Sequence, residues 1–520
     1  MSLSSDDTPT GPVDAPTGPI TGLATRPAPA TPEPMRKQNL VRDLTAAALV
    51  VTALFVPWNL YFGFGIPDSK PPLFALLGLV TLLSLLSLAV PYAGPWMLSG
   101  AGFNPVAAGR LRLGFNVPYL LFVVAFIGYD GFETIRFGGT VHVPGGIGPG
   151  GWLGVAGAVL SAQPVIIRAT DGDDRHHRRW LRTARFVGYA SLFGAALSSG
   201  FNLCWRLRFA LRGPGGALAF GTQNVTVAVT AVVYGVVAFV AVLVASRWIL
   251  KGTQDARLTT LALGASTLVA GIIVWGLPIG REIDAFHGIA QNTSTAGVGY
   301  EGYLAWAAAA ALFAPLTLFG PAKTRADQDV WAPAMRNGLL LIVVWCLGSV
   351  LMRITDLIVA VILNYPFSRY DSMTLAAFDL ATAVLAVWLR VNLGNRALGA
   401  RPIWSLCGLL FTLTVSRVIL GIVLAPRFQQ SPAVSPSPVY GNNLAQQITS
   451  TFDVVLCGLA LGIAVAVIVT GRPRRPARPR RPPHDAPTAV LSRPAGSPRI
   501  FRSATPAPPP KIFRPPGNPS

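Results

Sequence analysis

The sequence predicts an all-α protein, a polytopic bundle of transmembrane helices with about 12 spans. Hydrophobic residues make up 52% of the 520 residues and charged residues only 12%, and the mean hydropathy is +0.50. This composition is too apolar for a soluble globular protein of this length. We expect three parts: an N-terminal segment, residues 1–43, a transmembrane helical domain, residues 44–471, and a C-terminal tail, residues 472–520.

The predicted spans are apolar stretches of roughly the 17 to 25 residues that cross about 30 Å of hydrocarbon as a helix. The first six, in chain order, are 44–66, 72–92, 113–130, 151–166, 186–204 and 225–246. The last six are 258–280, 303–320, 339–365, 372–394, 404–426 and 448–471. The stretch at 151–166 is the shortest, so the span count depends on whether it crosses.

Both ends of the chain are rich in proline and lack a periodic apolar pattern. Residues 1–43 contain eight prolines, and residues 472–520 contain fifteen and begin with RPRRPARPRRPP. Such segments bury too little apolar surface to fold, and proline-rich runs favour an extended, solvated chain. We therefore expect a disordered cytoplasmic N-terminal arm and a disordered, arginine-rich cytoplasmic C-terminal tail.

A basic and aromatic repeat lies within this tail, where RIFR at 499–502 is followed by KIFR at 511–514. Its candidate contact residues are Phe501, Arg502, Phe513 and Arg514. Isolated apolar pairs in a disordered chain have no core to join, so they are suited to insert at a membrane surface while the arginines meet anionic lipid headgroups. Contact with a cytoplasmic partner and chance repetition are the alternatives.

Positive charge predicts the orientation, because Lys and Arg near span ends are retained on the cytoplasmic side. With the N-terminus inside, the inner loops and both terminal segments carry 31 Lys and Arg, and the outer loops carry 8. Both termini are therefore expected in the cytoplasm of a bacterium, with the spans in its plasma membrane. The net charge of +20 lies beside the membrane, so anionic lipid is expected as a partner and nucleic acid is not.

Motifs of familiar chemistry are missing or lack their structural context. Gly146, Gly148 and Gly151 have the G-x-G-x-x-G spacing of a dinucleotide site, but they link two spans, so we expect a flexible outer turn. Neither H-E-x-x-H nor G-x-x-x-x-G-K-[ST] occurs, and the four cysteines lack the spacing of metal sites. No cofactor, metal or catalytic residue is assigned, and a non-enzymatic role is favoured.

Titratable residues gather in two predicted outer loops. GYDGFETIRF contains Asp130 and Glu133, and GREIDAFHG contains Glu282, Asp284 and His287. Paired carboxylates with a histidine can serve acid and base chemistry on a lipid-linked substrate. Solvated loop ends are the simpler interpretation, since nothing in the sequence brings the two loops together.

Two arginines and three aspartates interrupt the last four predicted spans: Arg353, Asp356, Asp379, Arg417 and Asp453. Each charge near the bilayer centre costs about 2.5 to 3.5 kcal/mol, so such residues should face the bundle interior. If they converge, one surplus carboxylate can hold a proton or bind a cationic group on a substrate or ion pathway. Alternatively, Arg353 and Asp356 pair at i, i+3 and the others are interhelical hydrogen-bond partners.

LFVPWNLYFGFGIP at 54–67 resembles the start of uncharacterised multi-pass membrane proteins of mycobacteria and related actinobacteria. The resemblance implies a plasma-membrane location in an actinobacterium and brings no activity. Asp68, in the turn that follows, is similar in place to the early acidic residue of polytopic glycosyltransferases that use lipid-linked sugars, although the turn is far shorter here.

Three functions stay open. The intramembrane charges, and the resemblance of twelve spans to a major facilitator transporter, favour a transporter or permease of undefined substrate, which we place first. The outer-loop carboxylates favour an envelope glycosyl or lipid transferase that acts on the outer face. The basic tail favours a noncatalytic scaffold that recruits partners.

The charge distribution predicts which residues an impermeant thiol reagent reaches. In a chain without its native cysteines, cysteines placed at Ser4 and Gly517 should be protected in intact cells, and one at Ser294 should be labelled. Labelling after cell lysis is the control for reactivity. Labelling of either terminus in intact cells would contradict the orientation.

Overall fold

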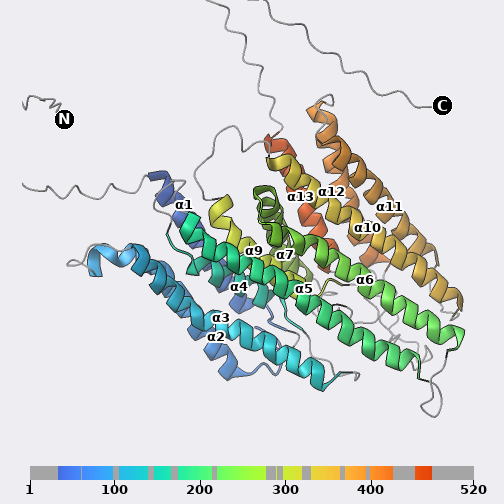
Figure 1. The fold of residues 1–520 in the computed structure, drawn as a ribbon, viewed down its shortest axis with the longest axis horizontal. Helices are drawn as coiled ribbons and strands as arrows, with labels where there is room; N and C mark the ends of the chain where they lie inside the picture. Colours follow the sequence, from blue (N-terminus) through green and yellow to red (C-terminus); the bar gives the residue numbers. More distant parts are fainter. Residues whose placement is uncertain are drawn as a thin grey trace, which may run out of the picture. The chain divides into compact units, whose positions relative to one another are not determined.

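The computed structural model describes residues 33–59, 61–97, 105–138, 146–165, 174–212, 220–276, 289, 297–318, 330–362, 369–393, 399–424 and 451–470. These residues form twelve α-helices and one isolated strand-like bridge (Figure 1). The first six helices are α1 (Glu33–Phe55), α2 (Pro71–Met97), α3 (Pro105–Arg136), α4 (Pro149–Ala162), α5 (Asp174–Ala210) and α6 (Thr222–Lys251). The others are α7 (Gln254–Gly276), α9 (Tyr300–Thr317), α10 (Trp331–Ile362), α11 (Arg369–Asn392), α12 (Ala400–Val423) and α13 (Thr451–Thr470).

Each predicted apolar stretch overlaps one of these helices, and the all-α membrane character is confirmed. Within the described residues, eight helices are long and apolar enough to cross a membrane: α2, α3, α6, α7, α10, α11, α12 and α13. The other four, α1, α4, α5 and α9, are not among these candidate spans. The structure therefore supports a membrane-embedded helical domain, and of the twelve predicted crossings it supports eight.

The first helix lies earlier in the chain than predicted. It begins at Glu33, so residues 33–43, which were expected to belong to a disordered arm, are helical. It ends at Phe55, two residues before Pro57. Because the residue before a proline avoids helical geometry, this proline explains the end of the helix. Residues 56–59 and 61–66 therefore belong to the turn between α1 and α2 and not to the first span.

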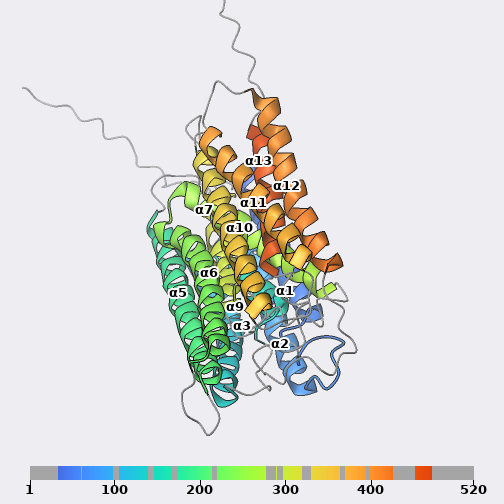
Figure 2. The same ribbon diagram turned by 90° about the vertical axis from the view of Figure 1, so that its right-hand side faces the viewer.

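The helices form three consecutive groups of four: α1 to α4, then α5, α6, α7 and α9, then α10 to α13. In every group each helix contacts the next in chain order, and the fourth returns to contact the first. The first two groups meet where α4 packs against α9. The second and third meet where α10 packs against α6 and α7, and where α13 packs against α7 (Figure 2).

Two helices, α4 and α9, are almost completely enclosed by their neighbours. In α4, 13 of the 14 residues are buried, and in α9, 14 of the 18. At 1.5 Å per residue α4 is about 21 Å long, which is shorter than about 30 Å of hydrocarbon. Both helices are rich in alanine or glycine, and such small residues let neighbouring helices approach closely.

Gly264 on α7 and Gly157 on α4 lie at two of these close approaches. A Cβ atom on Gly264 would lie 2.6 Å from the carbonyl oxygen of Trp306 on α9. One on Gly157 would lie 2.9 Å from the backbone nitrogen of Val50 on α1. Backbone atoms of a packed helix cannot move aside as a flexible side chain can, so both positions need glycine.

Gly264→Ala should therefore destabilise the bundle by at least the about 1 to 3 kcal/mol that overpacking costs. The melting temperature of the purified protein in detergent, followed by tryptophan fluorescence, measures this effect. Gly408→Ala on α12 is the matched control, because a Cβ atom there meets nothing within 4 Å. Equal melting temperatures for the two variants would contradict the close contact of α7 with α9.

Candidate functional site

The five charged residues that interrupt the last predicted spans are all buried in the third group. They are Arg353 and Asp356 on α10, Asp379 on α11, Arg417 on α12 and Asp453 on α13. Their exposed fractions do not exceed 7%. The charges therefore face the interior of the bundle, and they divide into two ion-paired sets.

The larger set, which we call the Arg417 set, joins all four helices of the third group. The Arg417 guanidinium pairs with the carboxylates of both Asp379 and Asp453. Its Nη2 also donates to Ser349 Oγ at 2.9 Å, and the Ser349 hydroxyl donates to Asp379 at 2.6 Å. The Trp345 indole donates to Asp453 at 2.6 Å. The five charged residues include one more aspartate than arginine. Because one guanidinium faces two carboxylates here, the surplus carboxylate lies in this set.

The smaller set joins the second group to the third. Arg353 Nη1 lies 3.7 Å from Asp356 Oδ2 at the i, i+3 spacing, and the Tyr234 hydroxyl on α6 donates to Asp356. Sequence reasoning did not find Tyr234, Trp345 or Ser349. A signal for two of them existed, since Trp345, Ser349 and Arg353 are four residues apart and share a helix face.

A second buried network, which the sequence did not predict, lies in the first group. Asp43 Oδ1 on α1 accepts from Nη2 of Arg42 at 2.9 Å and from Nη2 of Arg112, on α3, at 2.8 Å. The Tyr92 hydroxyl on α2 donates to the other Asp43 oxygen at 3.1 Å. Sequence reasoning missed this Asp43 network because it assigned the α1 residues to a disordered arm and Arg112 to an inner loop.

The Asp43 network contains two arginines and one aspartate, and both guanidinium groups also donate to carbonyls at the C-terminal end of α4. Arg112 Nε donates to the Ser161 carbonyl at 2.8 Å, and Arg42 Nη1 donates to the Pro164 carbonyl at 2.7 Å. The end of a helix carries carbonyl groups without helical partners and a partial negative charge. The two arginines therefore cap α4 and tie it to α1 and α3.

At its other end α4 holds the turn between α1 and α2. The Gly148 N–H donates to the Trp58 carbonyl at 2.6 Å, and the Gly150 N–H donates to the Pro57 carbonyl at 2.8 Å. A Cβ atom on Gly150 would lie 2.7 Å from Trp58 Cδ1. Residues 146–150 are buried, so the expectation of a flexible turn is wrong here. Glycine at this place allows the two stretches of backbone to approach each other closely.

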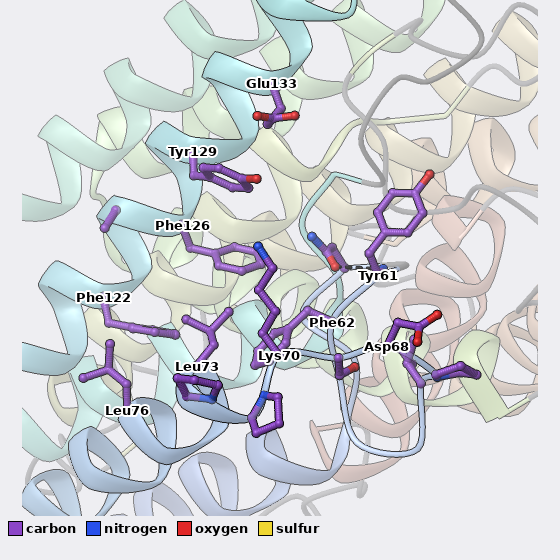
Figure 3. A pocket seen from close by; sticks show the side chains of 17 residues that line it. Tyr61, Phe62, Asp68, Lys70, Leu73, Leu76, Phe122, Phe126, Tyr129 and Glu133 are labelled. Carbon is purple, nitrogen blue, oxygen red and sulfur yellow. Dashed lines mark hydrogen bonds between the residues drawn. The ribbon is translucent and has the colours of Figure 1, made fainter.

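A cavity of about 1360 Å³ opens beside this turn, and we call it the α3 cavity. The turn, the start of α2 and the last part of α3 form its walls. Phe122, Phe126 and Tyr129 make an aromatic wall along one face of α3, and Leu73 and Leu76 contribute apolar surface from α2 (Figure 3). These side chains offer an apolar lining to a bound molecule.

Charged side chains of both signs share the α3 cavity. Asp68 and Lys70 come from the turn, and Glu133 comes from α3. Lys70 extends toward Phe126, and Glu133 lies beyond Tyr129 along α3 (Figure 3). Asp68 has a φ of 63°, a left-handed conformation that is uncommon outside glycine. The cavity is therefore amphipathic, because two carboxylates and one ammonium group line it together with the apolar wall.

The predicted outer-face residues do not form one cluster within the described residues. Glu133 lines the α3 cavity, whereas Asp130 is 3% exposed and does not line it. The interpretation of Asp130 as a solvated loop end is therefore wrong. Residues outside the described part include Glu282, Asp284, His287, Phe501, Arg502, Phe513 and Arg514. Glu301 was missed because it lies two residues before the predicted span 303–320.

The described part of the chain contains no cluster of three or more His, Cys, Asp and Glu side chains that could hold a metal ion. Cys346 and Cys407 are buried, and neither forms a disulfide. The residues that line the α3 cavity offer carboxylates, an ammonium group and aromatic rings.

Removal of one member of a buried ion pair should be more harmful than removal of both. Arg353→Ala leaves Asp356 without its guanidinium and should cost about 3 to 5 kcal/mol. The amount of folded protein extracted from membranes should fall in Arg353→Ala and should rise again when Asp356→Ala is added. Fluorescence-detected size-exclusion chromatography measures this amount. Arg353→Ala combined with Asp379→Ala is the control, since Asp379 pairs with Arg417. Better recovery of this control would contradict the observed pairing.

Comparison with known proteins gives one match. A family model described as a domain of unknown function (DUF7937) matches residues 39–472. No curated protein and no solved structure is significantly similar to the chain. The matched residues contain the Asp43 network, the α3 cavity and both ion-paired sets of the third group. The chain belongs to the DUF7937 family.

Proposed function

We propose that this protein binds an amphiphilic, lipid-linked molecule at the outer face of a bacterial plasma membrane. The observation that carries the proposal is the α3 cavity, which combines an apolar wall with charged groups. The distribution of 31 Lys and Arg inside and 8 outside supports an outer position for this cavity and a cytoplasmic position for both termini. The resemblance of residues 54–67 to the start of actinobacterial membrane proteins supports the choice of membrane.

The dimensions and the lining of the cavity support a large ligand with a long apolar part. Its volume of about 1360 Å³ exceeds the about 300 to 1,000 Å³ that is usual for small-molecule sites. Aromatic and leucine side chains surround an acyl or prenyl chain with groups about as apolar as the bilayer, so the chain can leave the lipid for the cavity without a penalty. Lys70 offers a compact positive charge with three donors, which suits a phosphate group.

The two carboxylates support a group transfer. Asp68 and Glu133 can accept hydrogen bonds from sugar hydroxyls, and a carboxylate can act as a general base. We infer a transferase that moves a glycosyl or lipid group. The acceptor hydroxyl oxygen bonds to the transferred group, its proton passes to one carboxylate, and the bond to the donor's lipid phosphate breaks. Lys70 then stabilises the negative charge of the leaving phosphate.

A transporter is the second candidate, and the surplus carboxylate of the Arg417 set favours it. A buried carboxylate without its own cation can take up a proton, as transport pathways require. However, all five charged residues are nearly inaccessible, so a substrate could reach them only after helices move. The accessible α3 cavity therefore supports the outer-face function more directly. A scaffold role would depend on the tail that contains Phe501 and Phe513.

Photolabelling with a diazirine analogue of a polyprenyl phosphate tests the site in nanodiscs. Lys70→Gln should lower labelling about tenfold, the effect of one lost charge-assisted hydrogen bond. Lys251→Gln, at the end of α6, is its matched control. Leu73→Trp should block labelling by filling the cavity. Its control is Leu380→Trp, because Leu380 on α11 is exposed and lies outside the α3 cavity.

The variants separate the parts of the proposal. Unchanged labelling in Leu73→Trp would overturn the assignment of the cavity as the lipid site. Loss of labelling in Leu73→Trp together with full labelling in Lys70→Gln would remove the phosphate contact. Retention of an envelope-lipid transfer activity in an Asp68→Asn, Glu133→Gln double variant would exclude the carboxylates as the base.

A further inference from the structure

The lining of the α3 cavity changes from charged to apolar in the same direction on both of its helices. On α3, Glu133 lies near the C-terminal end of the helix, and Phe122 lies nearer its middle (Figure 3). On α2, Lys70 directly precedes the first residue of the helix, and Leu76 lies in its second turn. The end of α3 and the start of α2 therefore form a polar end of the cavity, and the inner parts of both helices form an apolar end.

The cavity extends along α3 for about the thickness of one leaflet of a bilayer. Phe122 and Glu133 are eleven residues apart, which at 1.5 Å per residue is about 17 Å. The hydrocarbon core of a bilayer is about 30 Å thick, so one leaflet contributes about 15 Å of it. A ligand with its phosphate at Lys70 and its chain along the aromatic wall would therefore have the orientation of the lipids in a single leaflet.

One side of the cavity is open between the two helices. Leu76 on α2 is 45% exposed and Tyr129 on α3 is 55% exposed, and Ala125, one turn before Tyr129, is exposed as well. Phe122 and Phe126 line the same cavity but are no more than 9% exposed. We call the opening formed by Leu76, Ala125 and Tyr129 the lateral mouth.

Apolar helix surface flanks the lateral mouth on both sides. Leu79 follows Leu76 on α2, Leu121 and Val124 precede Ala125 on α3, and all three flanking side chains are more than half exposed. Both helices are candidate membrane spans. Large exposed apolar surfaces of this kind mark contact with a membrane or a partner, and on a membrane span the contact is lipid. The lateral mouth therefore faces hydrocarbon.

We propose that the α3 cavity takes its ligand sideways from the outer leaflet, through the lateral mouth, and that the distal part of a long chain stays in the bilayer. This inference rests on the proposed lipid-binding function. A path through the mouth keeps the chain in apolar surroundings throughout, whereas a path from the aqueous side would expose it to water. The site then recognises the phosphate and the first part of the chain, and it accepts every chain longer than about 17 Å.

Chain-length dependence tests this specificity in nanodiscs that contain the full-length protein. Unlabelled prenyl phosphates of increasing length compete with the diazirine analogue of polyprenyl phosphate, and each competitor is measured as a mole fraction of the bilayer. The fraction that halves labelling should fall until the chain spans about 17 Å and should then stay constant. A rise for the longest chains would show a closed pocket that excludes them, and it would overturn the proposal.

Narrowing the lateral mouth tests the route of entry. Ala125→Trp and Leu76→Trp should each lose most of the labelling by the long-chain probe. A short, water-soluble prenyl phosphate with the same diazirine should still label both variants, because it can enter at the polar end beside Lys70. Val124→Trp and Leu79→Trp are the matched controls, since these residues are exposed on the same helices and lie outside the cavity.

Failure of this inference and failure of the proposed function give different results. No saturable labelling of the unaltered protein by either probe would overturn the proposed function and the lateral mouth with it. Saturable labelling by both probes, with unchanged long-chain labelling in the two mouth variants, would overturn the lateral mouth alone. Equal loss of both probes in variants that elute like the unaltered protein in size-exclusion chromatography would do the same. If neither variant folds, the chain-length series decides by itself.

Discussion

Water is scarce in the hydrocarbon region of a membrane, so each polar group that this bundle buries has to meet another polar group of the protein. Arg417 meets the requirement on α12 by serving two carboxylates and a serine hydroxyl on three other helices. Asp43 meets it on α1 by accepting from Arg42 and Arg112. A lost partner leaves a buried charge that costs about 3 to 5 kcal/mol, so helix placement in both groups depends on these pairs.

The same requirement explains how the three groups are joined. The first and third groups each contain a charged network in their interior, whereas α4 and α9 meet through small apolar residues. Within the second group, Gly264 allows α7 to lie directly on the backbone of α9. Between the second and third groups, Tyr234 connects α6 to the Arg353 pair.

A structural ion-pair network and a substrate site have opposite requirements, and this difference is the reason for ranking the proposed functions. A structural ion-pair network is enclosed and its charges are paired, as they are in the Arg417 set. A substrate site is accessible and keeps polar groups available for the ligand, as Lys70 and Asp68 do in the α3 cavity. The intramembrane charges made transport the first hypothesis from the sequence. Their enclosure and the open amphipathic cavity favour an outer-face function instead.

The sequence by itself determined the helical membrane character and the approximate position of most of the described helices, because a transmembrane helix is specified locally by about 20 apolar residues. It also located the five intramembrane charges and included the pairing of Arg353 with Asp356 among its alternatives, because that spacing lies within one helix. Only the tertiary structure decided that α4 and α9 are enclosed, that Asp43 lies between two arginines, and that Arg417 pairs with both Asp379 and Asp453. Contacts of this kind join residues that are far apart in the chain, and they depend on how helices pack, which local composition does not specify.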